Sequence, residues 1–273
     1  MDALRCSICA EPLHPVNQSL RCERRHSFDI AKQGYVNLLH ARVDAGTADT
    51  TEMVAARAGF LSGGWYEPLT DLLAECVTGH GEHELVVDAG AGTGYYLARV
   101  LDRVPRAAGL ALDVSAPALR RAARAHPRIG AAVWNLWQPW PVASEVADVV
   151  LNVFAPRNPG EFQRVLRPGG LLVVAAPGPG HLAELAQRLP LLDIAGDKQH
   201  RLAEALSGRF ELADRAETAR TVSLAPADVR QLVLMGPNAH HLHRDGLGEA
   251  LDRLTESVQV TTAFQVSVFR RLP

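Results

Sequence analysis

Three cysteines and a histidine near the N-terminus are the residues of this chain best suited to hold a metal ion. Cys6 and Cys9 are separated by two residues, and Cys22 precedes His26 by four positions. A C-x-x-C turn can point both sulfur atoms at one ion, and the second pair can supply the other two corners of a tetrahedron. A disulfide would leave an odd thiol in this cluster. The spacing therefore predicts one structural zinc ion.

A glycine-rich turn after a buried apolar strand is the second chemical signature. Gly90, Gly92 and Gly94 follow the run 85–89. Glycines allow a sharp turn and let a ligand approach both the main chain and the positive end of the next helix. Asp113 ends the next apolar run, where a carboxylate can accept both hydroxyls of a ribose. The pattern predicts a nucleotide site. An ordinary strand-to-helix turn, and a helix cap at Asp113, are the structural alternatives.

The residues after the fourth strand help to distinguish an S-adenosylmethionine site from a dinucleotide site. There is one glycine loop, and the fourth strand of the sheet leads into Asn152-Val-Phe-Ala-Pro156. An amide and an aromatic ring at a strand exit suit a flat base held beside a methyl sulfonium, which favours S-adenosylmethionine over the dinucleotide of a dehydrogenase. Asp88 lies at the end of the first strand, where we expect it to support the loop and to take no part in the reaction.

Short apolar runs alternate with helical patterns from residue 84 onward, which is typical of a parallel sheet with helices on both faces. We expect strands at about 84–89, 108–113, 130–136, 146–153, 170–176, 218–224 and 258–271. Helices are expected near 52–61, from about 65 up to the break that begins at Thr78, and near 94–103, 116–126, 159–166, 181–189, 226–235 and 247–256. The predicted fold is α/β, a Rossmann-like class I methyltransferase with a mixed seven-stranded sheet and a small N-terminal zinc-ribbon module.

This organisation predicts three parts. They are a zinc-binding module at 1–40, a helical linker at 41–83 and an S-adenosylmethionine-dependent methyltransferase domain at 84–273. No run of about 18 or more apolar residues occurs, and the N-terminus has no signal-peptide pattern. We therefore expect a cytoplasmic protein with no membrane partner.

Net charge bears on the choice of partner. The formal net charge of −2 gives no global nucleic-acid signature, so any RNA would be held by a local patch. The candidate patch consists of Arg21, Arg24, Arg25, Lys32 and Arg42.

Four segments together closely resemble the RlmA family, the 23S ribosomal RNA guanine-N-1 methyltransferases. They are the zinc ligands, Phe28-Asp-Ile-Ala-Lys-Gln-Gly-Tyr-Val-Asn-Leu-Leu39, Val87-Asp-Ala-Gly-Ala-Gly-Thr-Gly94 and Asn152-Val-Phe-Ala-Pro156. The resemblance covers essentially the full length. Segments 48–57 and 152–158 look most like the branch that confers resistance to tylosin-type macrolides.

The resemblance implies two cofactors, one structural zinc ion and S-adenosyl-L-methionine. The zinc ligands would be Cys6, Cys9, Cys22 and His26. The partner would be 23S ribosomal RNA, and the zinc-binding module at 1–40 would serve RNA recognition. The cofactor-binding residues would be Tyr66, Asp88, Gly90, Gly92, Thr93, Gly94, Asp113 and His181. Many methyltransferases place an acid after the third strand for the adenine amine, but this chain has Asn135-Leu136-Trp137. Backbone groups or an amide must substitute there.

The expected reaction is methyl transfer to N-1 of a guanosine in the hairpin 35 loop, which must be unpaired or flipped out for the reaction. Asn152 is the candidate for the base edge, Phe154 for stacking or for the core, and Arg157 for a phosphate or the guanine carbonyl. The same chemistry at the neighbouring guanosine, as a housekeeping modification, is one alternative. A non-enzymatic zinc-ribbon RNA-binding protein is another. The sequence leaves the oligomeric state open, with a homodimer as one option.

Overall fold

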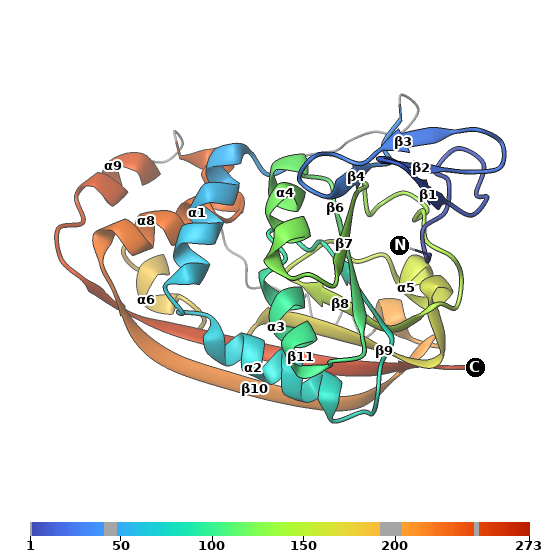
Figure 1. Cartoon of the computed structure of the whole chain (residues 1–273). Coiled ribbons are helices and arrows are strands. Elements are labelled where there is room, and N and C mark those ends of the chain that lie inside the picture. Colours follow the sequence, from blue (N-terminus) through green and yellow to red (C-terminus); the bar gives the residue numbers. More distant parts are fainter. Residues whose placement is uncertain (1, 41–47, 192–203, 243–245) are drawn as a thin grey trace.

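An eight-stranded sheet forms the centre of the molecule (Figure 1). The computed structural model describes residues 2–40, 48–191, 204–242 and 246–273, so Arg42 of the expected basic patch lies outside the described residues. The strand order is β10-β11-β9-β8-β5-β6-β7-β4. Neighbours from β4 to β9 are parallel, whereas β11 runs antiparallel to both β9 and β10.

The strands of this sheet are β4 (Tyr35–Asn37), β5 (Leu85–Ala89), β6 (Ala108–Asp113), β7 (Ile129–Val133), β8 (Ala147–Val153), β9 (Leu166–Pro177), β10 (Phe210–Leu224) and β11 (Val258–Arg271). A separate three-stranded antiparallel sheet near the N-terminus contains β1 (His14–Val16), β2 (Ser19–Arg21) and β3 (Ser27–Asp29).

Helices cover both faces of the large sheet, because successive strand residues point to opposite sides. Val86 belongs to a buried cluster with residues of α2, α3 and α4, whereas Val87 belongs to a second cluster with α5 and the N-terminal module. The helices are α1 (Thr51–Ser62), α2 (Glu67–Thr78), α3 (Tyr95–Arg103), α4 (Ala116–Ala125), α5 (Pro159–Val165), α6 (Ala183–Ala186), α8 (Pro226–Leu234), the 3-10 helix η1 (Pro237–His241) and α9 (Leu247–Asp252).

The α/β class predicted from the sequence is confirmed, but the sheet has one strand more than expected. The extra strand is β4, which pairs in parallel with β7 through Val36 and Ala132. Val36 and Leu38 are fully buried. A three-residue strand is too short for its alternation to be recognised, and it covers an edge of the sheet that would otherwise expose unpaired N–H and C=O groups. The N-terminal segment therefore extends the central sheet.

Several elements differ from the sequence prediction in length. Strand β9 begins at Leu166, four residues before the expected start, β7 ends at Val133, three residues before the expected end, and α9 ends at Asp252, four residues before the expected end. Strand β10 begins at Phe210, eight residues before the expected start, and α6 covers only Ala183–Ala186. Most β10 side chains are exposed, so this edge strand lacks the apolar alternation on which the prediction relied. Backbone pairing with β11, which runs from Phe210 to Leu224, holds these residues in a strand instead.

No helix within the described ranges is both long and apolar enough to cross a membrane.

The zinc module shares a core with the rest of the protein. Leu4 and Leu20 lie in the same buried cluster as Trp134, Trp140 and Phe162. Leu4 also forms an antiparallel bridge with Val142, so the segment after β7 pairs with the start of the chain. Because apolar burial and backbone pairing cross this boundary, the module and the sheet should unfold together.

Removal of the predicted metal should therefore destabilise the whole chain. We expect a chelator to lower the melting temperature of the protein in one cooperative transition, because the module would lose the binding energy that orders its turns. Differential scanning calorimetry measures this. Cys22→Ser is the control, since a chelator should not shift its melting further. A module that melts separately, with the main transition unmoved, would contradict the shared core.

Candidate active site and metal centre

The four predicted metal ligands converge on one point. Nδ1 of His26 lies 3.4 Å from the Sγ atoms of both Cys6 and Cys22, and the Sγ atoms of Cys9 and Cys22 are 3.7 Å apart. All four ligand atoms lie within 4.8 Å of one another, and the cysteines are free thiols. A tetrahedron with zinc–sulfur distances of about 2.3 Å has sulfur–sulfur edges of roughly 3.8 Å. The cluster fits one zinc ion.

Two tight turns position these ligands. The Ala10 N–H donates to the Cys6 carbonyl at 2.8 Å, and the Arg25 N–H donates to the Cys22 carbonyl at 2.9 Å. Ala10 and Arg25 both adopt positive φ angles, 61° and 65°. Each turn folds the chain back, so the two ligands that it carries face the same point.

The glycine loop between β5 and α3 has the left-handed backbone that its sequence predicts. Gly90, Gly92 and Gly94 have φ angles of 91°, 52° and 75°. A Cβ atom at Gly90 would lie 2.3 Å from the Cβ of Ala155, and one at Gly94 would lie 2.9 Å from the Cα of Ala122. The outer two glycines are therefore required both by conformation and by packing.

Asp113 holds this loop. One carboxylate oxygen accepts the N–H of Gly92 and the other accepts the N–H of Ser115, each at 2.8 Å. The side chain of Ser115 caps α4 by accepting the N–H of Ala118, so Asp113 is not the cap of that helix. Burial raises the pKa of Asp113, while the two N–H donors oppose this shift.

Asp88 does not support the loop as the sequence suggested. Its carboxylate is buried, and among the described residues neither oxygen has a hydrogen-bond partner. Burial, with a smaller effect of Asp113, raises the pKa of Asp88 to about 8. A buried acid without donors fits a site that receives a cationic ligand, because a nearby positive charge would favour the carboxylate.

Tyr66 and His181 meet although they are 115 positions apart. The Tyr66 hydroxyl lies 3.4 Å from His181 Nε2, and His181 Nδ1 accepts the Ala263 N–H at 3.2 Å. Burial lowers the pKa of His181 to about 4, so the ring is neutral. A neutral ring that accepts at Nδ1 carries its proton on Nε2 and donates to Tyr66, which leaves the hydroxyl proton free for a ligand.

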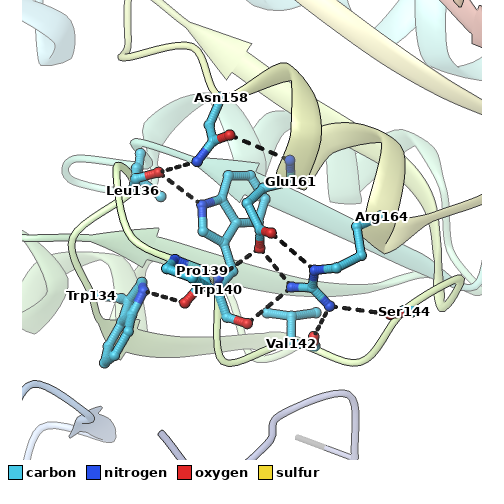
Figure 2. A network of polar contacts seen from close by, with 9 residues as sticks. All are labelled: Trp134, Leu136, Pro139, Trp140, Val142, Ser144, Asn158, Glu161 and Arg164. Atoms are coloured by element: carbon cyan, nitrogen blue, oxygen red, sulfur yellow. Dashed lines mark hydrogen bonds and ion pairs between the residues drawn. The ribbon is translucent and has the colours of Figure 1, made fainter. Parts of the chain in front are cut away.

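The segment after β7, where the sequence lacks the usual acid, is held against α5 by a polar network (Figure 2). Trp140 Nε1 and Asn158 Nδ2 both donate to the Leu136 carbonyl at 3.0 Å. Arg164 pairs with Glu161 at 2.6 Å and donates to the carbonyls of this segment. The network fixes the backbone beside the glycine loop.

The side chains of this segment define its surface toward the loop. Asn135 Oδ1 accepts the N–H of Trp137 at 3.0 Å, so the amide is turned onto its own backbone. A Cβ atom at Gly90 would lie 3.6 Å from Leu136 Cδ1. Leu136, which the sequence analysis did not select, therefore borders the loop with an apolar side chain.

The three predicted catalytic residues lie at and just beyond the end of β8. Asn152 is 1% exposed, and its Nδ2 donates to the carbonyls of Ala89 and Pro156. Its Oδ1 is buried without a partner among the described residues. Phe154 is 44% exposed and has a φ of 54°, so it is not a core residue. Arg157 is half-buried, and burial lowers the pKa of its guanidinium.

Phe154 belongs to a row of aromatic rings along the carboxyl edge of the sheet. Its ring centroid is 6.3 Å from that of Tyr96 and 5.9 Å from that of Phe264. Phe264 in turn packs against Tyr66 at 4.7 Å. The row joins the glycine loop to the Tyr66–His181 pair and leaves Phe154 as its exposed member.

The structure thus brings the predicted cofactor residues to one edge of the sheet, and Thr93 lies buried among them at 8% exposure. The edge offers orphaned carboxylate oxygens on Asp88, a glycine cradle and an apolar wall at Leu136. These features fit a cationic nucleoside such as S-adenosylmethionine. Sequence reasoning also missed Arg57 of α1, the residue nearest to a Cβ placed at Gly92.

The shifted pKa of Asp88 should make the stability of the cofactor-free protein depend on pH. A free Asp titrates near pH 4, so between about pH 4 and pH 8 the folded state binds more protons than the unfolded state. The free energy of unfolding should therefore fall as the pH rises, by up to about 1.4 kcal/mol per pH unit. Asp88→Asn should remove this contribution. Urea unfolding of both proteins across this range measures it, and equal slopes would contradict the shift.

Comparisons with known proteins agree with this geometry. Residues 4–43 match the family model described as RlmA, N-terminal, a zinc ribbon, and residues 86–170 match a methyltransferase domain. The 23S rRNA (guanine(748)-N(1))-methyltransferase of Streptomyces fradiae is 47% identical over 273 residues, which cover 99% of this chain and 97% of that protein.

Two further relatives are also named as 23S rRNA guanine-N-1 methyltransferases. A Micromonospora griseorubida protein, provisionally named a 23S rRNA (guanine-N(1)-)-methyltransferase, is 48% identical over 98% of this chain and 97% of its own length. A Bacillus subtilis protein with the same provisional activity, YxjB, is 33% identical over 68% of each chain. With its zinc ribbon and its S-adenosylmethionine site, the chain belongs to the RlmA family of 23S rRNA (guanine-N1)-methyltransferases.

Proposed function

We propose that this enzyme methylates N-1 of guanosine 748 in the hairpin 35 loop of 23S ribosomal RNA and thereby protects the ribosome from tylosin-like macrolides. The observation that carries the proposal is 47% identity, over 99% of this chain, to the Streptomyces fradiae enzyme named for that position. The intact glycine loop, held by Asp113, favours this function over the non-enzymatic zinc-ribbon RNA-binding alternative.

S-adenosylmethionine supplies an activated methyl group on a sulfonium. The chain has to orient that group against N-1 of the base, because transfer to a ring nitrogen requires an in-line approach. Asp113 would accept the ribose hydroxyls while its carboxylate holds Gly92, and Tyr66, which lies against His181, would donate its hydroxyl proton to an acceptor on the cofactor. Leu136 offers an apolar surface for the adenine.

The guanine would enter from the exposed end of the aromatic row. Phe154 would stack on the flipped base. Its partly exposed ring and its contacts with Tyr96 and Phe264 support this role. The Nδ2 group of Asn152 is already bonded, so only Oδ1 remains for an external donor. The N-2 amino group of guanine matches this acceptor. The N-1 proton has to leave, to a base or to solvent, as the bond to the methyl group forms. Arg157, at the same strand exit, is the candidate for a phosphate or the carbonyl.

The exposed cations of the zinc ribbon are the proposed holding surface for the RNA. Arg25 and Lys32 are exposed, and Arg24 is exposed with a 3.7 Å ion pair to Glu11. Phosphate contacts of this kind fix the position of a nucleic acid without reading its sequence. We place the reaction in the cytoplasm, where ribosomal RNA is found, and a homodimer stays a prediction.

Methyl transfer from labelled cofactor to 23S RNA fragments, with primer extension across the hairpin 35 loop, tests the proposed target. We expect extension to stop at guanosine 748, because an N-1 methyl blocks base pairing, and tylosin resistance to rise in a susceptible host. A stop at the neighbouring guanosine with unchanged drug susceptibility would instead favour the housekeeping alternative.

Replacement of Phe154 should separate RNA methylation from cofactor binding. A base stacked on an aromatic ring contributes about 1–3 kcal/mol, so Phe154→Ala should lower kcat/KM for RNA by roughly 5- to 150-fold. Calorimetry should show unchanged S-adenosylmethionine affinity, and Phe154→Tyr, which keeps the ring, should retain activity. An equal loss in the Tyr variant would argue against stacking.

A further inference from the structure

Arg57 of α1 places a positive charge at the glycine loop. Its Nη1 lies 2.5 Å from Asp49 Oδ2, and its Nη2 donates to the Met235 carbonyl at the end of α8 at 2.7 Å. Only a quarter of the side chain is exposed. These two partners come from separate parts of the chain, so they hold the guanidinium in a defined position.

The head group of Arg57 faces the middle of the loop. A Cβ atom at Gly92 would lie 2.9 Å from Arg57 Nη1, and the next two nearest atoms also belong to Arg57. Gly92 itself has a φ of 52° and gives its N–H to Asp113. The absence of a side chain at Gly92 therefore keeps the space between the loop backbone and the guanidinium free.

The charges at this edge match those of the cofactor. Asp88 and Asp113 are acids, and S-adenosylmethionine carries two positive groups, the sulfonium and the amino group of its methionine part. It also carries one carboxylate, which requires a cation or several N–H donors. Arg57 has five N–H donors in a planar fork and here engages one carboxylate and one carbonyl, so further donors remain.

We propose that Arg57 forms the binding site for the methionine carboxylate of S-adenosylmethionine, with Asp49 and the Met235 carbonyl orienting its guanidinium. The inference rests on the cofactor of the proposed function and is independent of the RNA target. Arg57 is then the residue by which the enzyme distinguishes the intact amino-acid end of the cofactor from one that lacks the acid.

Calorimetric titration with S-adenosylmethionine and with decarboxylated S-adenosylmethionine tests the site without RNA. The two ligands share the sulfonium, the amine and the adenosine. Wild type should bind the decarboxylated form about 10- to 100-fold more weakly, as expected for a charged hydrogen bond. Arg57→Gln should lose a similar factor for S-adenosylmethionine and keep its affinity for the decarboxylated form within about twofold.

Arg99→Gln is the matched control, because Arg99 lies on the surface of α3 in a 3.8 Å ion pair with Glu67, and it should change neither affinity. An equal loss for both ligands in Arg57→Gln would mean that Arg57 only braces α1 against α8, and this would overturn the proposal. Equal binding of both ligands by wild type would overturn it too.

If the Gln variant does not fold, Arg57→Lys replaces it. Lysine keeps the charge but not the fork, so it should bind S-adenosylmethionine more weakly and leave decarboxylated binding unchanged. Full S-adenosylmethionine affinity in that variant would contradict the carboxylate contact. Failure of the RNA target alone would appear only in the primer-extension assay and would leave these affinities unaffected.

Discussion

The contact between the Asp113 carboxylate and the backbone of the glycine loop is the interaction on which the site depends. Gly92 N–H and Ser115 N–H each bind one of its oxygens, so one side chain joins the loop after β5 to the start of α4. The N–H groups of Gly90 and Ala91 donate to the Leu112 carbonyl, and Asp113 adds the bond that holds Gly92, the middle of the three glycines with positive φ angles. The ordered loop in turn defines where Arg57, Leu136 and the buried Asp88 lie relative to a ligand.

The residues of the candidate site lie at the carboxyl edge of the parallel strands because β5, β6, β7 and β8 all end there. The zinc ribbon extends the same sheet through β4 and pairs with the segment after β7 through Leu4. Metal binding, the adenine side of the site and the surface proposed for RNA are therefore parts of one folded unit. The aromatic row connects this unit to the C-terminal hairpin, because Phe154 contacts Tyr96 of α3 and Phe264 of β11, and Phe264 contacts Tyr66.

Sequence reasoning predicted the central strands well because buried parallel strands read as short apolar runs, and it predicted the zinc cluster because ligand spacing follows from metal geometry. It missed β4 and the first half of β10, where pairing with a neighbour replaces any pattern along the chain. Tyr66 and His181 were selected through resemblance, since no local pattern joins residues so far apart. Arg57 was not selected from the sequence, because only the fold places it at Gly92.

The central claim is that Asp113 orders a preformed S-adenosylmethionine site. Calorimetric titration of the cofactor into Asp113→Ala, on protein shown to be folded, tests it most directly. The account predicts at least a tenfold loss of affinity, since a charged hydrogen bond contributes about 1.5–3 kcal/mol and this carboxylate also holds the loop. Affinity equal to that of wild type would contradict the claim.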